Sequence, residues 1–177
     1  MNSTVVIGLG NRLLSDEGIG LVLLEALARQ AAEFPNVDFL ELGTGGMALL
    51  HVLAGRKMAL ILDCAHMGAA PGTLRRFTPD TVRVSDVPPC FSLHESNVLD
   101  LIALARRVGE CPERLIIFGI QPETLAPGAK VSSVLQARLP EYLSVIRKEL
   151  TLLYPLPGGA GASVGAKSWK RIRIKYN

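Results

Sequence analysis

The 177-residue chain has few cysteines and few aromatic residues, and it contains no long apolar run. Its cysteines, Cys64, Cys90 and Cys111, are widely spaced and form no C-x-x-C pair. This pattern predicts reduced, packed thiols rather than disulfides or a structural zinc site. No stretch of about 18 apolar residues is present, so no transmembrane helix is predicted. The first residues lack the features of a secretory signal, and we therefore expect a cytoplasmic protein.

Several catalytic and nucleotide-binding motifs are missing as well. The sequence has neither the Gly-x-Ser-x-Gly turn of serine hydrolases nor the His-Glu-x-x-His helix of zinc proteases, and it has no Walker phosphate-binding loop. Gly8 and Gly10 begin a dinucleotide fingerprint, but Leu13 occupies the position of its third glycine. Asp16 and Glu17 would also repel a phosphate there. A nucleotide-binding enzyme is therefore the weaker interpretation.

Positive charge is scarce outside the C-terminal tail. Five of the 19 Lys and Arg residues lie in the last eleven positions. The rest of the chain has 14 basic and 16 acidic side chains, and therefore a net charge of −2. The basic face of a nucleic-acid-binding domain is thus missing. From Pro155 the sequence becomes rich in Gly and Pro. We predict a single domain over residues 1–154, followed by a flexible linker and a solvated basic tail over residues 155–177.

Apolar strand segments alternate with amphipathic helices along the domain. The pattern predicts strands over residues 4–9, 37–42, 58–62, 73–77 and 115–119, and helices from about residue 15 and over 47–54, 96–108 and 131–153. Pro140 should kink or interrupt the last helix. Such alternation predicts an α/β fold with three α/β/α layers, in which helices cover both faces of a mostly parallel twisted sheet of about five strands.

Three side chains that are distant in sequence are predicted to meet at one edge of this sheet. Right-handed crossovers place the strand-to-helix loops at the carboxyl edge, where ligands bind. Glu17 follows the first strand, Asp63 ends the third, and His94 lies in a loop before a helix. Two carboxylates and an imidazole suit a divalent transition metal and leave coordination positions for water or a partner's ligands.

Each of these residues also has a structural interpretation. Asp16 or Glu17 can cap a helix, Asp63 can cap the next segment, and a single loop histidine is common. His66, three residues after Asp63, is an alternative imidazole. His51 lies among apolar residues of a short helix, where a packed or rim histidine is the expected role.

Six short motifs follow one another in a specific order. They are Gly8–Gly20, Glu41–Gly46, Ile61–Ala65, Pro71–Thr73, Ser92–His94 and Gly119–Glu123. Together they resemble the nickel–iron hydrogenase maturation endopeptidases, and the resemblance extends from about Val5 to Leu153. It implies a three-layer α/β fold and an endopeptidase that removes a C-terminal extension from the hydrogenase large-subunit precursor after nickel insertion.

The resemblance also implies roles for individual residues. The family's metal-binding acid, aspartate and histidine fall on Glu17, Asp63 and His94, and a further family acid, commonly aspartate, falls on Glu41. Asp16 or Glu41 is then a candidate general base. The expected partner is the nickel-loaded precursor, so nickel arrives with the substrate and no permanent cofactor is expected. We expect a monomer that binds neither nucleic acid nor membrane. A nickel-delivery protein without peptidase activity is the alternative.

Overall fold

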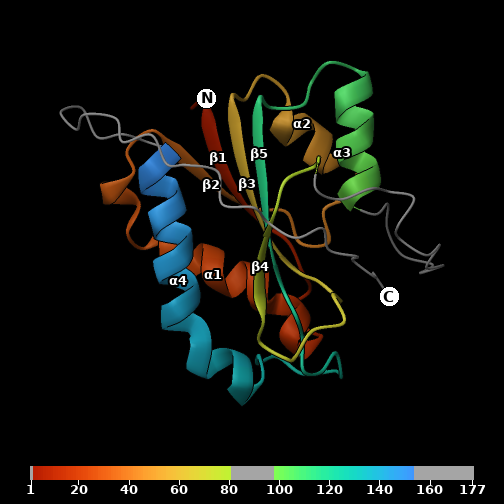
Figure 1. Cartoon of the computed structure of the whole chain (residues 1–177), viewed down its shortest axis with the longest axis vertical. Helices are drawn as coiled ribbons and strands as arrows, with labels where there is room; N and C mark the ends of the chain where they lie inside the picture. Colours follow the sequence, from red (N-terminus) through yellow and green to blue (C-terminus); the bar gives the residue numbers. More distant parts are fainter. Residues whose placement is uncertain (1, 81–97, 154–177) are drawn as a thin grey trace.

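The computed structural model describes residues 2–80 and 98–153. Strands and helices alternate along the chain (Figure 1). The elements are β1 (Thr4–Gly8), η1 (Ser15–Gly18), α1 (Ile19–Ala28), η2 (Ala31–Glu33), β2 (Val37–Glu41), α2 (Ala48–Leu53), β3 (Met58–Cys64), β4 (Leu74–Phe77), α3 (Val98–Arg107), β5 (Arg114–Ile120) and α4 (Ser133–Leu153).

The five strands form one sheet in the order β2-β1-β3-β5-β4. β1, β2, β3 and β5 are parallel, whereas the edge strand β4 pairs antiparallel with β5. The predicted mostly parallel sheet is confirmed. The chain first moves from β1 to β2 and then crosses to β3 on the other side of β1. The strand order therefore reverses between β1 and β3, the kind of position where ligands bind in open α/β sheets.

Helices cover both faces of the sheet, as predicted (Figure 1). Alternate side chains of β1 show how the two layers are built. Val5 and Ile7 pack in the cluster that contains residues of α2 and α3, whereas Val6 packs in the cluster that contains residues of α1 and α4. This alternation is the period of two that a strand requires. Two apolar cores thus fix the sheet and leave its carboxyl edge to the loops.

Two elements differ from the sequence prediction in ways that matter for the site. β3 continues to Cys64, two residues beyond the apolar segment 58–62, so Asp63 lies within the strand, opposite Gly119 of β5. α4 is not interrupted at Pro140. Buried residues on both sides of that proline, including Leu135 and Tyr142, hold the helix against the sheet. Tertiary packing therefore outweighs the lost backbone donor.

None of the helices in the described ranges combines the length and apolar character needed to cross a bilayer. Cys64 and Cys111 are free thiols, in line with the prediction, while Cys90 lies outside the described residues. The tail proposed to begin at Pro155 also lies outside them.

Candidate active site

Two glycines bring the start of the first helix onto the carboxyl ends of β1 and β3. A Cβ atom on Gly20 would lie 2.3 Å from the carbonyl oxygens of both Leu9 and Leu62. A Cβ atom on Gly10 would lie 1.9 Å from the carbonyl oxygen of Glu17, and the φ of Gly10 is +133°. Only glycine permits these backbone approaches. The close packing places η1, which carries Glu17, over the end of β3.

Asp63 is a buried carboxylate that interacts electrostatically with Glu17. Its side chain lies near the end of β3, the residue is 9% exposed, and Oδ1 accepts a hydrogen bond of 2.8 Å from the Cys64 N–H. Burial raises the pKa of Asp63 to about 7, the hydrogen bond opposes that rise, and the negative charge of half-buried Glu17 adds to it. The structure thus brings two of the three predicted ligands together.

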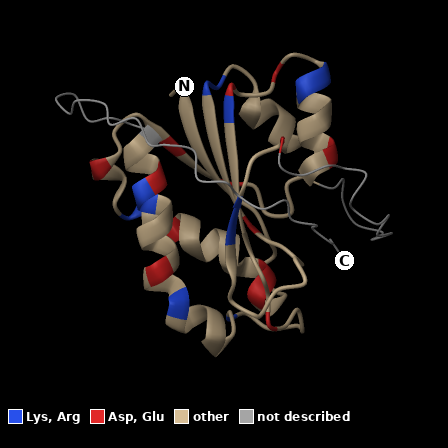
Figure 2. Cartoon of the chain, viewed as in Figure 1, with Lys and Arg blue, Asp and Glu red and all other residues tan. Residues whose placement is uncertain are grey.

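A cation is the natural complement of this pair. An anion removed from water next to a second carboxylate is costly unless an opposite charge compensates it. Figure 2 shows acidic positions on η1, at the lower end of the sheet where the parallel strands finish. Carboxylate oxygens with an imidazole are suitable donors for a divalent transition metal. Within residues 2–80 and 98–153 no third metal-binding side chain joins the two acids, and His94 lies outside the described residues.

Asp16 has a different environment from its neighbour Glu17. It is fully buried, and its carboxylate accepts three backbone hydrogen bonds. Oδ2 accepts from the N–H groups of Glu123 (2.8 Å) and Thr124 (3.1 Å), and Oδ1 accepts from the N–H of Ser132 (2.6 Å). The side chain does not cap η1. These bonds favour a structural role, in which Asp16 anchors the loop between β5 and α4.

Glu41 is held by Arg12 at the outer end of the same edge. The guanidinium donates from Nη2 to Oε2 over 2.8 Å and from Nε to Oε1 over 3.3 Å. These bonds hold the pKa of Glu41 below its usual range. The backbone joins the same two loops, because the Gly10 N–H donates to the carbonyl of Gly43 over 2.7 Å. A paired carboxylate with a lowered pKa is a weak proton acceptor at neutral pH.

Two histidines of the described chain have distinct surroundings. His66 follows β3, and its Nε2 is buried without a hydrogen-bond partner among the described residues. Burial lowers the pKa of His66, so its ring is neutral at pH 7. Its participation in a metal site stays a prediction. His51 lies on α2 and is exposed.

Gln121 has a positioning role that the sequence did not reveal. It is buried directly after β5, and its Oε1 accepts N–H groups from Met67 (2.7 Å) and Ala69 (3.3 Å). The side chain therefore fixes the loop that follows Asp63. The sequence showed Gln121 only as part of the motif Gly119–Glu123. Its position, as a polar residue immediately after a buried strand, was the one signal that could have indicated this role.

Cys64 does not provide a nucleophile at this edge. Burial raises the pKa of its thiol, and the charges of Asp63, Glu17 and Asp16 raise it further. The thiol is therefore protonated at neutral pH. Because the thiolate is the reactive form, cysteine-protease chemistry has no support here.

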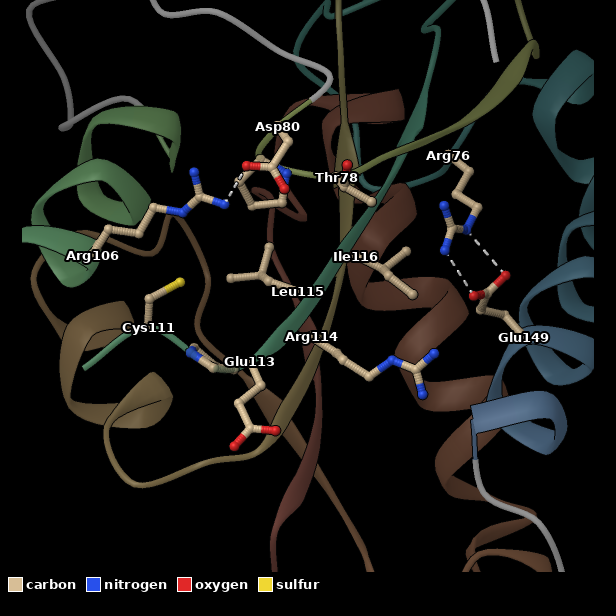
Figure 3. A pocket seen from close by; sticks show the side chains of 12 residues that line it. Arg76, Thr78, Asp80, Arg106, Cys111, Glu113, Arg114, Leu115, Ile116 and Glu149 are labelled. Carbon is tan, nitrogen blue, oxygen red and sulfur yellow. Dashed lines mark hydrogen bonds and ion pairs between the residues drawn. The ribbon is translucent and has the colours of Figure 1, made fainter. Parts of the chain in front are cut away.

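A separate cavity of about 230 Å³ lies at the opposite end of β5 (Figure 3). Arg106 donates to Asp80 over 2.8 Å, and Arg76 donates twice to Glu149 over 3.0 and 3.1 Å. Arg114, which also lines the cavity, is the first residue of β5, and Asp63 pairs near the strand's last residues. The cavity is thus distant from the acidic pair, and its paired charges leave little net charge for a ligand.

Known proteins with similar sequences and folds cover most of the chain. A family model for hydrogenase maturation protease matches residues 21–149. The hydrogenase 2 maturation protease of Escherichia coli is 33% identical over 153 residues, which cover 81% of this chain and 90% of that protein. The solved structure of the hydrogenase maturating endopeptidase HybD from E. coli has a TM-score of 0.72 and 28% identity, and the match covers 87% of this chain and 94% of that one.

A longer relative shows how far the likeness extends. The hydrogenase expression/formation protein HupD of Rhodobacter capsulatus is 36% identical over 121 residues, or 68% of this chain. The match spans only 58% of the length of that relative. The family model itself matches well over half of the residues of this chain, including Asp63. The chain therefore belongs to the hydrogenase maturation protease family.

Proposed function

We propose that the chain is an endopeptidase that removes the C-terminal extension of a nickel–iron hydrogenase large-subunit precursor after nickel insertion. The observation that carries the proposal is the buried carboxylate of Asp63 beside Glu17 at the point where the strand order reverses. Family membership supports the same reaction. Nickel belongs to the substrate in this proposal, and the chain needs no cofactor of its own.

Glu17, Asp63 and His94 are the proposed contacts to the precursor's nickel. The two carboxylates offer oxygen donors from η1 and β3, and a neutral His94 would offer nitrogen. Docking on these groups tests whether the precursor holds its metal. It also fixes the scissile peptide at the carboxyl edge of the sheet, and holding a reactant in place lowers the barrier by several kcal/mol.

The geometry of the other two acids guides their proposed roles. The three backbone bonds to Asp16 occupy its carboxylate, and the Arg12 pair lowers the basicity of Glu41. We therefore assign Asp16 and Glu41 to positioning rather than to proton transfer. This leaves the group that accepts a proton from the attacking water among the metal-contacting side chains.

The test is cleavage of nickel-loaded precursor by the full chain, followed by mass spectrometry. The wild type should release a short C-terminal peptide, whereas Glu17→Gln, Asp63→Asn and His94→Ala should be folded and inactive. Asp80→Asn is a suitable control, because Asp80 is exposed and lies beside the distant cavity. Full cleavage by both Asp63→Asn and His94→Ala would refute the ligand assignment. Nickel transfer without a change in precursor mass would identify a carrier instead of a protease.

A further inference from the structure

An exposed apolar surface adjoins the segment that carries Glu17. Leu13, in the loop between β1 and η1, is 71% exposed, the largest value among the exposed large apolar residues of the described chain. Residues 125–129, with the sequence Leu-Ala-Pro-Gly-Ala, lie beside it in the loop between β5 and α4, and all of them except half-buried Leu125 are exposed. We refer to Leu13 and residues 125–129 as the rim platform.

Backbone hydrogen bonds join the two halves of the rim platform. The Gly128 N–H donates to the carbonyl of Leu13 over 2.9 Å, and the Ser15 N–H donates to the carbonyl of Gly128 over 2.8 Å. Leu14 and Gly128 form a parallel β-bridge. The Ser15 hydroxyl donates to the carbonyl of Ala126 over 2.7 Å. The platform is therefore one continuous surface, and its Leu13 lies four residues before Glu17 in the sequence.

The exposure of Leu13 is not that of a frayed loop. Ser15 has a φ of +43°, the sole positive φ of a non-glycine residue in the described ranges, and such a conformation persists only where its surroundings enforce it. Asp16 anchors the same loop from the interior through Glu123, Thr124 and Ser132. These bonds hold the main chain around Leu13 in place, so its exposed side chain is kept at the surface close to Glu17.

We infer that the rim platform binds apolar residues of the hydrogenase large-subunit precursor next to its scissile peptide. The inference rests on the proposed function. A protease must hold its substrate on at least one side of the cut bond, and the platform continues directly from the proposed metal contact Glu17 along the carboxyl edge. It contains no charged side chain; Arg12, Glu123 and Lys130 lie just outside it, and Arg12 is paired with Glu41. Apolar substrate residues are therefore the complementary chemistry.

The size of the platform favours a peptide segment over a second copy of the chain. A stable protein interface buries about 800 Å² per partner and involves roughly 20–30 residues on each side. Leu13 together with residues 125–129 provides only six residues, among which Leu13 has the most exposed large side chain. A short segment that is also tethered through its metal can use such a surface.

The test compares Leu13→Ser with Leu152→Ser in the full chain, using nickel-loaded precursor. Leu152 is 52% exposed near the end of α4 and provides a matched loss of an exposed leucine. Leu13→Ser should raise KM roughly tenfold, as expected for truncating one apolar contact residue, with kcat unchanged. Its melting temperature should equal that of the wild type, and Leu152→Ser should change neither constant. The conservative variant Leu13→Met should restore a low KM.

Precursor binding is measured separately in the Asp63→Asn background, so that the platform and the proposed reaction can fail independently. An inactive wild type would refute the proposed function, while weaker precursor binding after Leu13→Ser would still support the platform. An unchanged KM and unchanged binding for Leu13→Ser would overturn the inference. Equal losses in Leu13→Ser and Leu13→Met, with lower melting temperatures, would assign Leu13 a structural role and also overturn it. A dimer in sedimentation experiments that Leu13→Ser abolishes would assign the platform to a second copy of the chain, against the inference.

Discussion

Asp16 and Ser132 are 116 residues apart in the sequence, yet the Ser132 N–H donates to Oδ1 of Asp16 over 2.6 Å. The other carboxylate oxygen accepts the N–H groups of Glu123 and Thr124. A single side chain thus ties η1 to the loop that leads into α4. Because Glu17 is the next residue, the same bonds help to fix the position of a proposed metal contact.

Replacement of Asp16 by alanine should strongly destabilise the protein. The substitution leaves three backbone donors without their acceptor, and we expect the free energy of unfolding to fall by about 3 kcal/mol. Urea unfolding followed by circular dichroism measures the change. Asp80→Ala is the control, since its exposed pair with Arg106 should contribute less than about 1 kcal/mol. Equal effects of the two substitutions would contradict the structural role of Asp16.

Replacement by alanine should destabilise the protein at Gly20 but not at Gly18, although the two glycines are separated by one residue. Gly20→Ala places a methyl group 2.3 Å from two carbonyl oxygens and should cost roughly 2–3 kcal/mol. Because the helix must move away from β3, precursor cleavage should also fall. Gly18→Ala is the matched control: its Cβ would have no neighbour nearer than 3.4 Å. Thermal unfolding and cleavage rates of both variants test the prediction, and a tolerated Gly20→Ala would show that the close approach is unnecessary.

The ion pair between Asp38 and Arg56 should give a pH-dependent contribution to stability. Hydrogen bonding to buried Arg56 is the largest cause that lowers the pKa of Asp38 below its ordinary value of 3.8. A lowered pKa in the folded state means that the contribution is complete above the unfolded-state pKa and is lost as the pH falls through the folded-state pKa. Asp38→Asn should therefore cost about 2 kcal/mol at neutral pH, and the difference from wild type should shrink below about pH 4. Urea titrations across this range measure it. A difference that is constant with pH would rule out the ion pair as its source.

The sequence predicted the fold well, because its strong signals are local. Apolar segments marked four of the five strands, the Pro71-Gly72 turn marked the strand at 73–77, and the alternation of strands with helices indicated the parallel sheet. The antiparallel direction of β4 was not predicted, since no periodicity in Leu74–Phe77 distinguishes the two directions. Pro140 was expected to interrupt or kink α4, but the helix runs on through it. The sequence pattern could not show this, because it does not reveal how firmly the surrounding residues pack.

The site was predictable in part for a related reason. Topology alone indicated that Glu17 and Asp63 lie at one edge, and the structure brings them together. The role of Asp16 could not be predicted, because its hydrogen-bond partners are more than 100 residues away and are backbone groups of a loop. Backbone donors have no sequence signature. His94 lies outside the described residues, and its role stays a prediction.

The elevated pKa of Asp63 means that its ionised form opposes folding at neutral pH. A screen that rewards heat resistance alone should therefore favour uncharged replacements at this position, which would remove a proposed metal contact. Directed evolution of this protein for thermostability should thus be scored on processed precursor in every round, because selection for folding and selection for the proposed activity oppose each other at this single carboxylate.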